Sequence, residues 1–201
     1  MTETGARLEF WYDFASTYSY LSAMRIETLA AAAGVEVAWR PFLLGPIFAA
    51  QGWTTSPFNL YPAKGRNMVR DIERLATERG LGFALPARFP QNSLMAARLA
   101  LVGGDEGWIA PFTRAVYLAE FARGLDISDR QALAAILQSL HLDSEQIFAR
   151  IEQADIKERL RRQTAEAQAR GIFGAPSFLV GEELFWGDDR LDQALAWAKR
   201  G

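Results

Sequence analysis

The chain has 201 residues, of which 50% are hydrophobic and 12% aromatic, and it contains no cysteine. This length allows one large domain, or a small domain interrupted by another. The lack of cysteine excludes a thiolate nucleophile, a zinc–thiolate site and a dithiol redox cycle within the chain. The formal net charge of −2 comes from 22 basic and 24 acidic residues, a balance that argues against nucleic-acid binding.

Targeting and metal-binding signals are also missing. The first ten residues, MTETGARLEF, have no basic region followed by an apolar one, so no signal peptide is predicted. No apolar run approaches the roughly 20 residues of a membrane span. No residues have the spacing of metal ligands. We therefore expect a cytoplasmic protein that binds neither a membrane nor a metal ion.

The N-terminal part predicts a β-α-β unit. Residues 7–14 alternate between two faces, which indicates a strand. Residues 16–33 are rich in Ala and Leu and are followed by Gly34, which predicts a helix with a glycine stop. Residues 35–42 predict a second strand. A right-handed crossover between two parallel strands follows from this order.

The middle of the chain predicts helices and no strands. A loop over residues 44–62 is expected to precede helices over about 63–80, 92–102 and 106–122, the second of them buried. Ser128 and Asp143, each followed three residues later by Gln, resemble capping boxes that open two short helices. A further helix is predicted to end at Gly171.

Strand character returns at the C-terminal end. Residues 177–180 and 184–186 flank a tight turn, and Asp188 begins a final helix. A β-α-β half and a β-β-α half make a thioredoxin-type sheet, so we predict an α/β, thioredoxin-like fold with an inserted all-helical domain. Residues 1–43 and 171–201 would form the thioredoxin-like domain, and residues 44–170 the helical insertion.

Ser16 is the first candidate functional residue. It follows the first strand at the start of a helix, where free N–H groups and the helix dipole stabilise an anion such as a thiolate. Its hydroxyl would donate a hydrogen bond to a sulfur anion, but the only histidine, His141, lies in the insertion, so Ser16 lacks a base that would make it a nucleophile. The alternative is a helix N-cap, a position that serine favours.

Pro176 is the second candidate, because it opens a predicted strand where it cannot donate to the sheet ladder. At this place in a thioredoxin-type sheet we expect a cis Ala175–Pro176 bond, which would turn the N–H and C=O of Ala175 outward to pair with an extended peptide. The alternative is an ordinary trans proline at a strand entry.

Charged residues at two helix starts complete the candidates. Asp189, in the turn that follows the last strand, would hold an ammonium group while nearby N–H groups hold a carboxylate; the alternative is helix capping. Lys64 falls in the first turn of its helix, where a cation opposes the helix dipole. Such a charge sometimes marks a carboxylate partner, and more often is a surface lysine without a role.

Five segments in this order resemble one family, the 2-hydroxychromene-2-carboxylate isomerases. They cover residues 13–21 (DFASTYSYL), 40–45 (RPFLLG), 62–66 (PAKGR), 174–177 (GAPS) and 185–191 (FWGDDRL). The resemblance runs nearly end to end. The family is related to kappa-class glutathione transferases and, more distantly, to DsbA-type disulfide oxidases, which implies a DsbA-like fold.

The resemblance also implies bound glutathione and an isomerase that acts on a small aromatic substrate in aromatic-compound catabolism. Ser16 would be the catalytic residue at the glutathione sulfur, and the backbone at Ala175 and Pro176 would pair with the cysteinyl unit. Asp188 and Asp189 would meet the γ-glutamyl end, and Lys64 the glycyl carboxylate. A substrate pocket would be formed by Phe42, Trp53, Phe58 and Tyr61. Relatives form homodimers, so a homodimer is expected.

Three functions therefore compete. The first is a glutathione-dependent isomerase of an aromatic enone acid, in which thiolate addition makes a C=C bond single, allows rotation and is then reversed. The second is a kappa-like glutathione transferase, which releases the conjugate. The third is a non-catalytic thioredoxin-fold module that binds a peptide along the Pro176 strand.

Overall fold

The structure is a computed structural model, and it describes residues 5–53 and 56–200. Residues 1–4, the start of the segment for which no signal peptide is predicted, lie outside the described residues. The strands are β1 (Arg7–Tyr12), β2 (Glu36–Pro41), β3 (Ser177–Val180) and β4 (Glu183–Trp186). The helices are α1 (Thr17–Ala23), α2 (Ile26–Ala33), α3 (Leu44–Ala50), α4 (Pro57–Leu60), α5 (Pro62–Glu78), α6 (Leu94–Glu106), α7 (Ile109–Tyr117), the π-helical turn η1 (Leu118–Ala122), α8 (Arg130–Ser139), α9 (Ser144–Ile151), α10 (Ala154–Ala169), the 3₁₀ turn η2 (Asp188–Arg190) and α11 (Leu191–Ala198).

The four strands form one mixed sheet in the order β2-β1-β3-β4. β1 pairs in parallel with β2 and antiparallel with β3, so that Phe10 lies between Trp39 and Phe178 in the register. β3 and β4 pair antiparallel as a hairpin. The predicted β-α-β and β-β-α halves are confirmed, and they meet at the pair of central strands.

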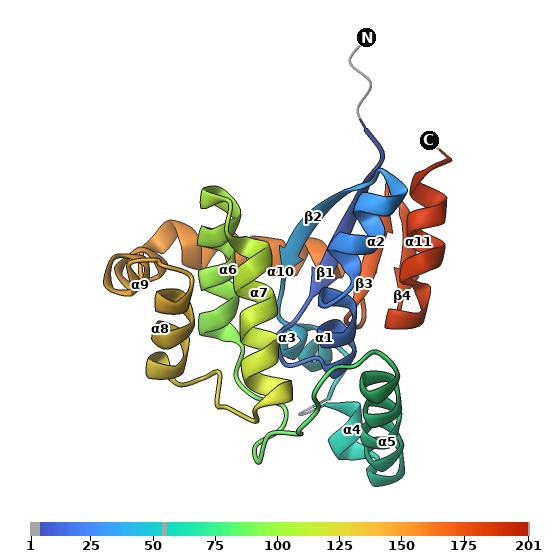
Figure 1. The fold of residues 1–201 in the computed structure, drawn as a ribbon, viewed down its shortest axis with the longest axis horizontal. Coiled ribbons are helices and arrows are strands. Elements are labelled where there is room, and N and C mark those ends of the chain that lie inside the picture. Colours follow the sequence, from blue (N-terminus) through green and yellow to red (C-terminus); the bar gives the residue numbers. More distant parts are fainter. Residues whose placement is uncertain (1–4, 54–55, 201) are drawn as a thin grey trace.

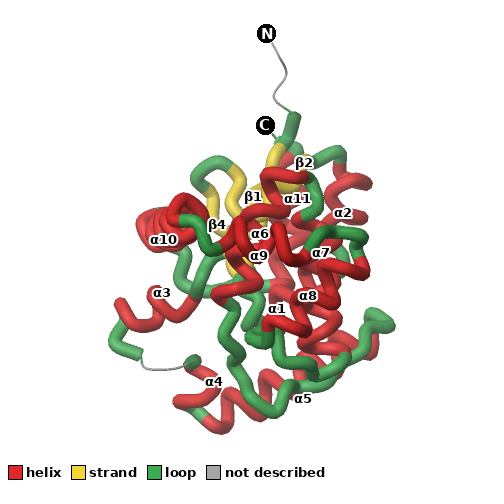
Figure 2. The backbone as a smooth tube through the Cα atoms, turned by 90° about the vertical axis from the view of Figure 1, so that its left-hand side faces the viewer, coloured by secondary structure: helices red, strands yellow, loops and turns green. Residues whose placement is uncertain are grey.

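Both faces of the sheet are covered by helices, which explains why β1 is apolar on both sides. Phe10 and Tyr12 face a large core cluster that includes residues of α2, α7 and α11. Trp11 faces the other way, into a smaller cluster with Leu179 and with residues of α3 and α10. Figure 2 shows α10 and α2 on opposite sides of the strands. The central strands are therefore a rigid support for the loops at their ends.

Helices α3 to α10 lie between the two halves of the sheet in the sequence, as predicted. Figure 1 shows α6–α9 beside the sheet, and α4 and α5 projecting at the end of the molecule away from the termini. The insertion shares its core with the sheet, because the Tyr12 hydroxyl lies 2.8 Å from Thr113 Oγ1 of α7. The division into domains at residues 43 and 171 stays a prediction.

Two elements near the N-terminus are shorter than predicted. The strand expected over residues 7–14 ends at Tyr12, because Asp13 Oδ1 accepts a hydrogen bond from the Ala15 N–H (3.0 Å) and turns the chain. The helix expected over residues 16–33 is two helices, α1 and α2, separated where Arg25 leaves helical geometry (φ −125°, ψ −17°). Gly34 ends α2 at a positive φ of 68°, as predicted.

The prediction of a loop over residues 44–62 is wrong, because α3 and α4 lie within this range. Pro46 hid α3 from sequence reasoning, yet it falls in the first helical turn, where proline is tolerated. The helix predicted to begin with a Ser128 cap is capped instead by Asp129, whose side chain accepts from the Gln131 N–H. The Asp143 cap is confirmed.

Candidate functional site

Ser16 lies at the start of α1, directly beyond the end of β1. It is the helix N-cap, and its Oγ accepts a hydrogen bond from the Ser19 N–H at 3.2 Å. The same hydroxyl donates to the carbonyl of Ala175 at 2.9 Å, across 159 residues of sequence. The capping alternative is thus correct, and the cap is also in contact with the second candidate segment. Ser16 is 8% exposed, so most of its surface is covered by the surrounding protein.

The Ala175–Pro176 peptide bond is cis, as predicted. Only part of the expected backbone arrangement follows. The Ala175 carbonyl accepts from Ser16 and does not face outward, whereas the Ala175 N–H has no hydrogen-bond acceptor within residues 5–53 and 56–200. Ala175 is half-buried, so this N–H is the backbone donor that remains for an extended peptide.

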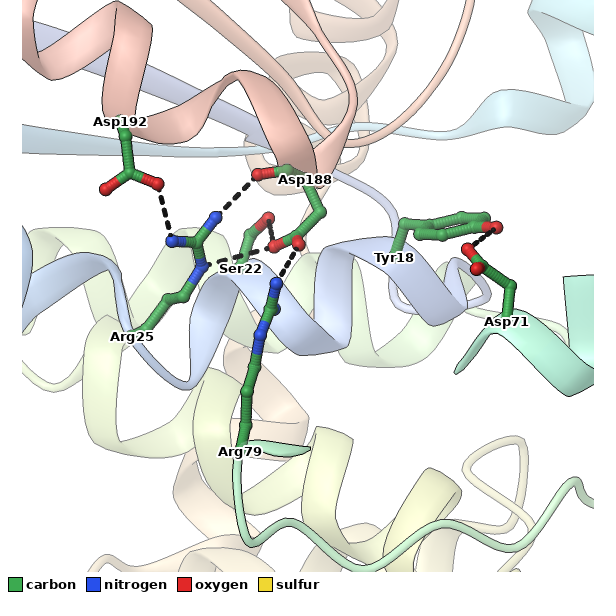
Figure 3. Close-up of polar contacts among 7 residues, drawn as sticks. All are labelled: Tyr18, Ser22, Arg25, Asp71, Arg79, Asp188 and Asp192. Carbon is green, nitrogen blue, oxygen red and sulfur yellow. Dashed lines mark hydrogen bonds and ion pairs between the residues drawn. The ribbon is translucent and has the colours of Figure 1, made fainter. Parts of the chain in front are cut away.

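Asp188 is buried (3% exposed) and its carboxylate is already engaged. Oδ1 accepts from Ser22 Oγ (2.8 Å) and from Arg25 Nε (3.4 Å), and Oδ2 accepts from Arg79 Nη2 (2.7 Å). Figure 3 shows the two guanidinium groups approaching Asp188 from different elements. The side chain therefore faces the protein, which argues against its predicted direct contact with a ligand.

Asp189 is the exposed neighbour in the same turn. Its side chain is 73% exposed and lies 3.5 Å from Arg190 Nη2. Gly187, at φ 108°, precedes the turn, and its N–H donates to the Pro176 carbonyl at 3.0 Å. The positive φ of Gly187 is one that residues with a side chain rarely adopt, so glycine is favoured here. Asp189 is thereby held on a turn that is bonded to the cis-proline segment.

Lys64 lines a cavity of about 400 Å³ between α1, α4 and α5, together with Tyr18, Phe58, Ala63, Asn67 and Met68. Its Nζ lies 4.9 Å from the centre of the Tyr61 ring and forms no ion pair with a carboxylate in the described part of the chain. Lys64 is the third residue of α5, which starts with Pro62 at N1. The cavity therefore has a cation free to meet an anionic ligand.

The first turn of α1 forms another wall of this cavity. Thr17 Oγ1 donates to Met68 Sδ at 3.4 Å, and the Tyr18 hydroxyl donates to Asp71 Oδ2 at 2.8 Å. Burial, together with the hydrogen bond to Asp71, raises the pKa of Tyr18, so its hydroxyl stays protonated at neutral pH. These two contacts bring the Lys64 cavity next to Ser16, although Ser16 is not among its lining residues.

The predicted aromatic pocket is assembled only in part. Phe58 lines the Lys64 cavity and also a second cavity of about 490 Å³ on the far side of Met68. Tyr61 is 52% exposed and adjoins Lys64, while Trp53 packs against Phe48 with ring centres 5.6 Å apart. Phe42 has no exposed surface and packs against Trp11, so its predicted place in a substrate pocket is wrong.

Sequence reasoning missed Arg25, Arg79 and Tyr18. Arg79 and Asp188 are 109 residues apart, and Arg25 and Asp188 are 163 apart, so no local spacing signals either contact. Tyr18 lies inside the segment 13–21 that carries the family resemblance, which was the available signal. Within the described residues no group of three His, Asp or Glu side chains is arranged to hold a metal ion, and no helix there is long and apolar enough to cross a membrane.

The fold and this site define a class of protein. Residues 7–196 match the family described as DSBA-like thioredoxin domain, and the chain belongs to it. The chain also superposes on a solved 2-hydroxychromene-2-carboxylate isomerase with a TM-score of 0.86 and 26% sequence identity, covering 96% of this chain and 95% of the other. The predicted thioredoxin-like fold with helical insertion is confirmed.

Within that class the chain belongs to the 2-hydroxychromene-2-carboxylate isomerase family. It is 30% identical to the enzyme of that name from Sphingobium xenophagum over 193 residues, which is 96% of both chains. It is 25% identical to glutathione S-transferase kappa 2 from Caenorhabditis elegans, covering 92% of this chain and 88% of the relative. The predicted family and the predicted isomerase class of enzyme are confirmed by these relatives.

Proposed function

We propose that the protein is a glutathione-dependent isomerase of 2-hydroxychromene-2-carboxylate or a similar aromatic enone acid. The observation that carries the proposal is the contact of the Ser16 hydroxyl with the carbonyl of cis-bonded Ala175, beside a cavity with a free lysine. The Ala175 N–H, Asp189 and Lys64 are separate groups that suit the cysteinyl backbone, the γ-glutamyl ammonium and the glycyl carboxylate of glutathione. In the same proposal the enzyme works in the cytoplasm, as a homodimer, in the breakdown of aromatic compounds.

The described residues fit an extended tripeptide with charged ends. The free Ala175 N–H would donate to the carbonyl of the cysteinyl unit, next to Pro176. The exposed Asp189 carboxylate would accept from the γ-glutamyl ammonium, on the turn that Asp188 fixes. Lys64 would bind the glycyl carboxylate. When bound, glutathione would supply the thiolate that adds reversibly to the C=C bond of the substrate.

The chain would contribute orientation and charge stabilisation to that reaction. The Ser16 hydroxyl would turn from the Ala175 carbonyl toward the sulfur and donate a hydrogen bond to its negative charge. The Ser19 N–H in the first turn of α1 bonds to Ser16 Oγ, and the N–H groups before it have no partner inside the helix; such groups would lower the pKa of a nearby thiol. Phe58, Tyr61 and Trp53 would surround the aromatic ring.

The test is a comparison of Ser16→Ala with Ser139→Ala, a serine in α8 whose hydroxyl donates only to the Ile136 carbonyl. With glutathione and the enone acid, we expect Ser16→Ala to lose about 10²-fold in kcat, the size seen when a donor to a developing negative charge is removed. Ser139→Ala should keep the wild-type rate. If calorimetry shows no heat of binding when glutathione is added to the wild-type protein, the proposal is wrong.

A kappa-like transferase is the second candidate, and the Caenorhabditis elegans relative favours it. The two functions differ in the fate of glutathione. With an aryl halide and an enone acid assayed side by side, stoichiometric loss of glutathione indicates the transferase. Unchanged glutathione with conversion of the enone acid indicates the isomerase.

A further inference from the structure

Side chains from α1, from the junction of α1 and α2, and from the end of α5 meet at Asp188. Ser22 lies in α1, Arg25 lies between α1 and α2, and Arg79 follows the last residue of α5. Besides its bonds to the carboxylate, Arg25 donates through Nη2 to the Asp188 carbonyl (2.6 Å) and through Nη1 to Asp192 of α11 (2.9 Å). Figure 3 shows Arg25 between the two aspartates and Arg79 reaching Asp188 from the other side. We call these residues the Asp188 cluster.

The cluster joins the insertion to the thioredoxin-like part of the chain through α5. Three residues of α5 or its end contact the opposite part: Met68 contacts Thr17, Asp71 contacts Tyr18, and Arg79 contacts Asp188. Lys64, Met68 and Asp71 follow one another at spacings of four and three residues, which places them on one face of the helix. The face that carries Lys64 is thus the face that contacts α1.

Charge explains why the contact at Asp188 is well defined. A buried carboxylate is costly unless it is paired and hydrogen-bonded. Ser22, Arg25 and Arg79 satisfy both oxygens of Asp188, and Arg79 is itself only 25% exposed in its side chain. Removing Arg79 would leave the carboxylate with Ser22 and with Arg25 as its one cationic partner among the described residues, both bonded to Oδ1.

The turn that begins with Asp188 holds the other candidate for a ligand charge. Asp189 follows Asp188 directly, and Gly187 is bonded to Pro176. The turn is therefore attached to the cis-proline segment, to α1 and Arg25, and, through Arg79, to α5. Lys64 and Asp189, which the proposed function assigns to the two ends of glutathione, lie on elements that the Asp188–Arg79 ion pair links directly.

We propose that the Asp188 cluster is a positioning device for a γ-glutamyl peptide: it sets α5, with Lys64, relative to the turn that carries Asp189. Asp188, Arg25 and Arg79 are positioning residues that do not touch the ligand. The inference rests on the proposed function and adds how the residues assigned to the two ends of glutathione are held relative to each other.

The experiment uses two ligands and the full chain. Glutathione has both charged ends, whereas γ-glutamylcysteine lacks the glycine and so does not use Lys64. Calorimetry would give the Kd of each ligand for three proteins: the wild type, the variant Arg79→Gln, and the double variant with Arg79→Gln and Asp188→Asn. The double variant places two neutral amides where the ion pair was. Arg161→Gln is the control, an arginine 75% exposed in α10 that pairs only within its own helix.

We expect Arg79→Gln to weaken the binding of glutathione about 10-fold and that of γ-glutamylcysteine about twofold or less. The reason is that small misplacements of binding groups are costly. The double variant should recover most of the glutathione affinity, and Arg161→Gln should bind both ligands as the wild type does. A merely structural role would weaken both ligands equally or lower only the Tm, and either result overturns the inference. Wild-type protein that binds no glutathione overturns the proposed function as well.

Discussion

The two sides of the candidate site are built differently. On one side, Ser16 and Ala175 lie on loops at the ends of central strands whose side chains are buried on both faces of the sheet. On the other side, Lys64, Phe58 and Tyr61 lie on α4 and α5, which project from the molecule (Figure 1) and contact α1 through few polar bonds. Ser16, which the proposed function places at the sulfur, is thus held by the central strands, whereas the proposed substrate wall is joined to the large core cluster through one face of α5, with Met68, Ile72 and Ala76.

The largest expected effect comes from opening a cavity on the core side. Phe178 in β3 has no exposed surface and stacks on Phe10 with ring centres 5.5 Å apart. We expect Phe178→Ala to lower the free energy of unfolding by about 3–5 kcal/mol, measured by denaturant titration. Leu60→Ala, at a residue 40% exposed in α4, should change it by about 0.5 kcal/mol or less. Equal losses would contradict the difference between the two sides.

A smaller effect is expected from the close approach of α4 and α5. A Cβ on Gly65 would lie 2.5 Å from the Phe58 carbonyl oxygen, while a Cβ on Gly104 in α6 would lie 3.7 Å from Ile109 Cδ1. We expect Gly65→Ala to cost about 1–3 kcal/mol through this overlap and to raise KM for the aromatic substrate. Gly104→Ala should be neutral or stabilising by up to about 1 kcal/mol. Equal stability of the two variants would show that α4 does not pack on α5 as described.

An effect that depends on pH is expected at Glu120, in the π-helical turn of the core. Its side chain has no exposed surface, and neither carboxyl oxygen has a hydrogen-bond partner in the described part of the chain. Burial, with smaller contributions from Asp13 and Asp126, raises the pKa of Glu120 well above 4.5. The folded protein therefore holds this proton more tightly than the unfolded chain does.

The sign of the pH dependence follows from that difference. The stability that Glu120 contributes is complete below its unfolded pKa and is lost as pH rises through the raised folded pKa. Glutamine has no proton to lose, so Glu120→Gln should gain stability relative to the wild type as pH rises from about 4.5 to about 8. Chemical denaturation of both proteins across this range measures it. A constant difference would contradict the neutral state of Glu120 in the fold.

The sequence predicted what depends on local pattern. The strand alternation, the Gly34 stop and the Asp143 cap follow from residues close together in the chain, and all are confirmed. The cis Ala175–Pro176 bond, also confirmed, was predicted from its place in a thioredoxin-type sheet. Segment order was enough to predict the fold class. The same local patterns predicted Ser16 as a cap, which is confirmed, and as a contact of a bound anion, which stays a prediction.

What could not be predicted depends on contacts far apart in sequence. Phe42 was assigned to a pocket because the family resemblance implied one there, but Phe42 packs against Trp11 on the opposite face of the sheet from Phe10. Asp188 was assigned to a ligand because the family resemblance implied it, but Arg25 and Arg79 reach it from distant segments. Helix α3 was missed because Pro46 resembles a breaker and lies instead in a first turn, where it fits.

The central claim is that a sulfur from outside the chain binds at the Ser16 hydroxyl. A crystal structure of the protein with glutathione tests it directly. The account predicts the sulfur within hydrogen-bond distance of Ser16 Oγ, with that hydroxyl turned away from the Ala175 carbonyl. Glutathione bound elsewhere, or a Ser16 hydroxyl still bonded to Ala175 with no sulfur beside it, would contradict the account.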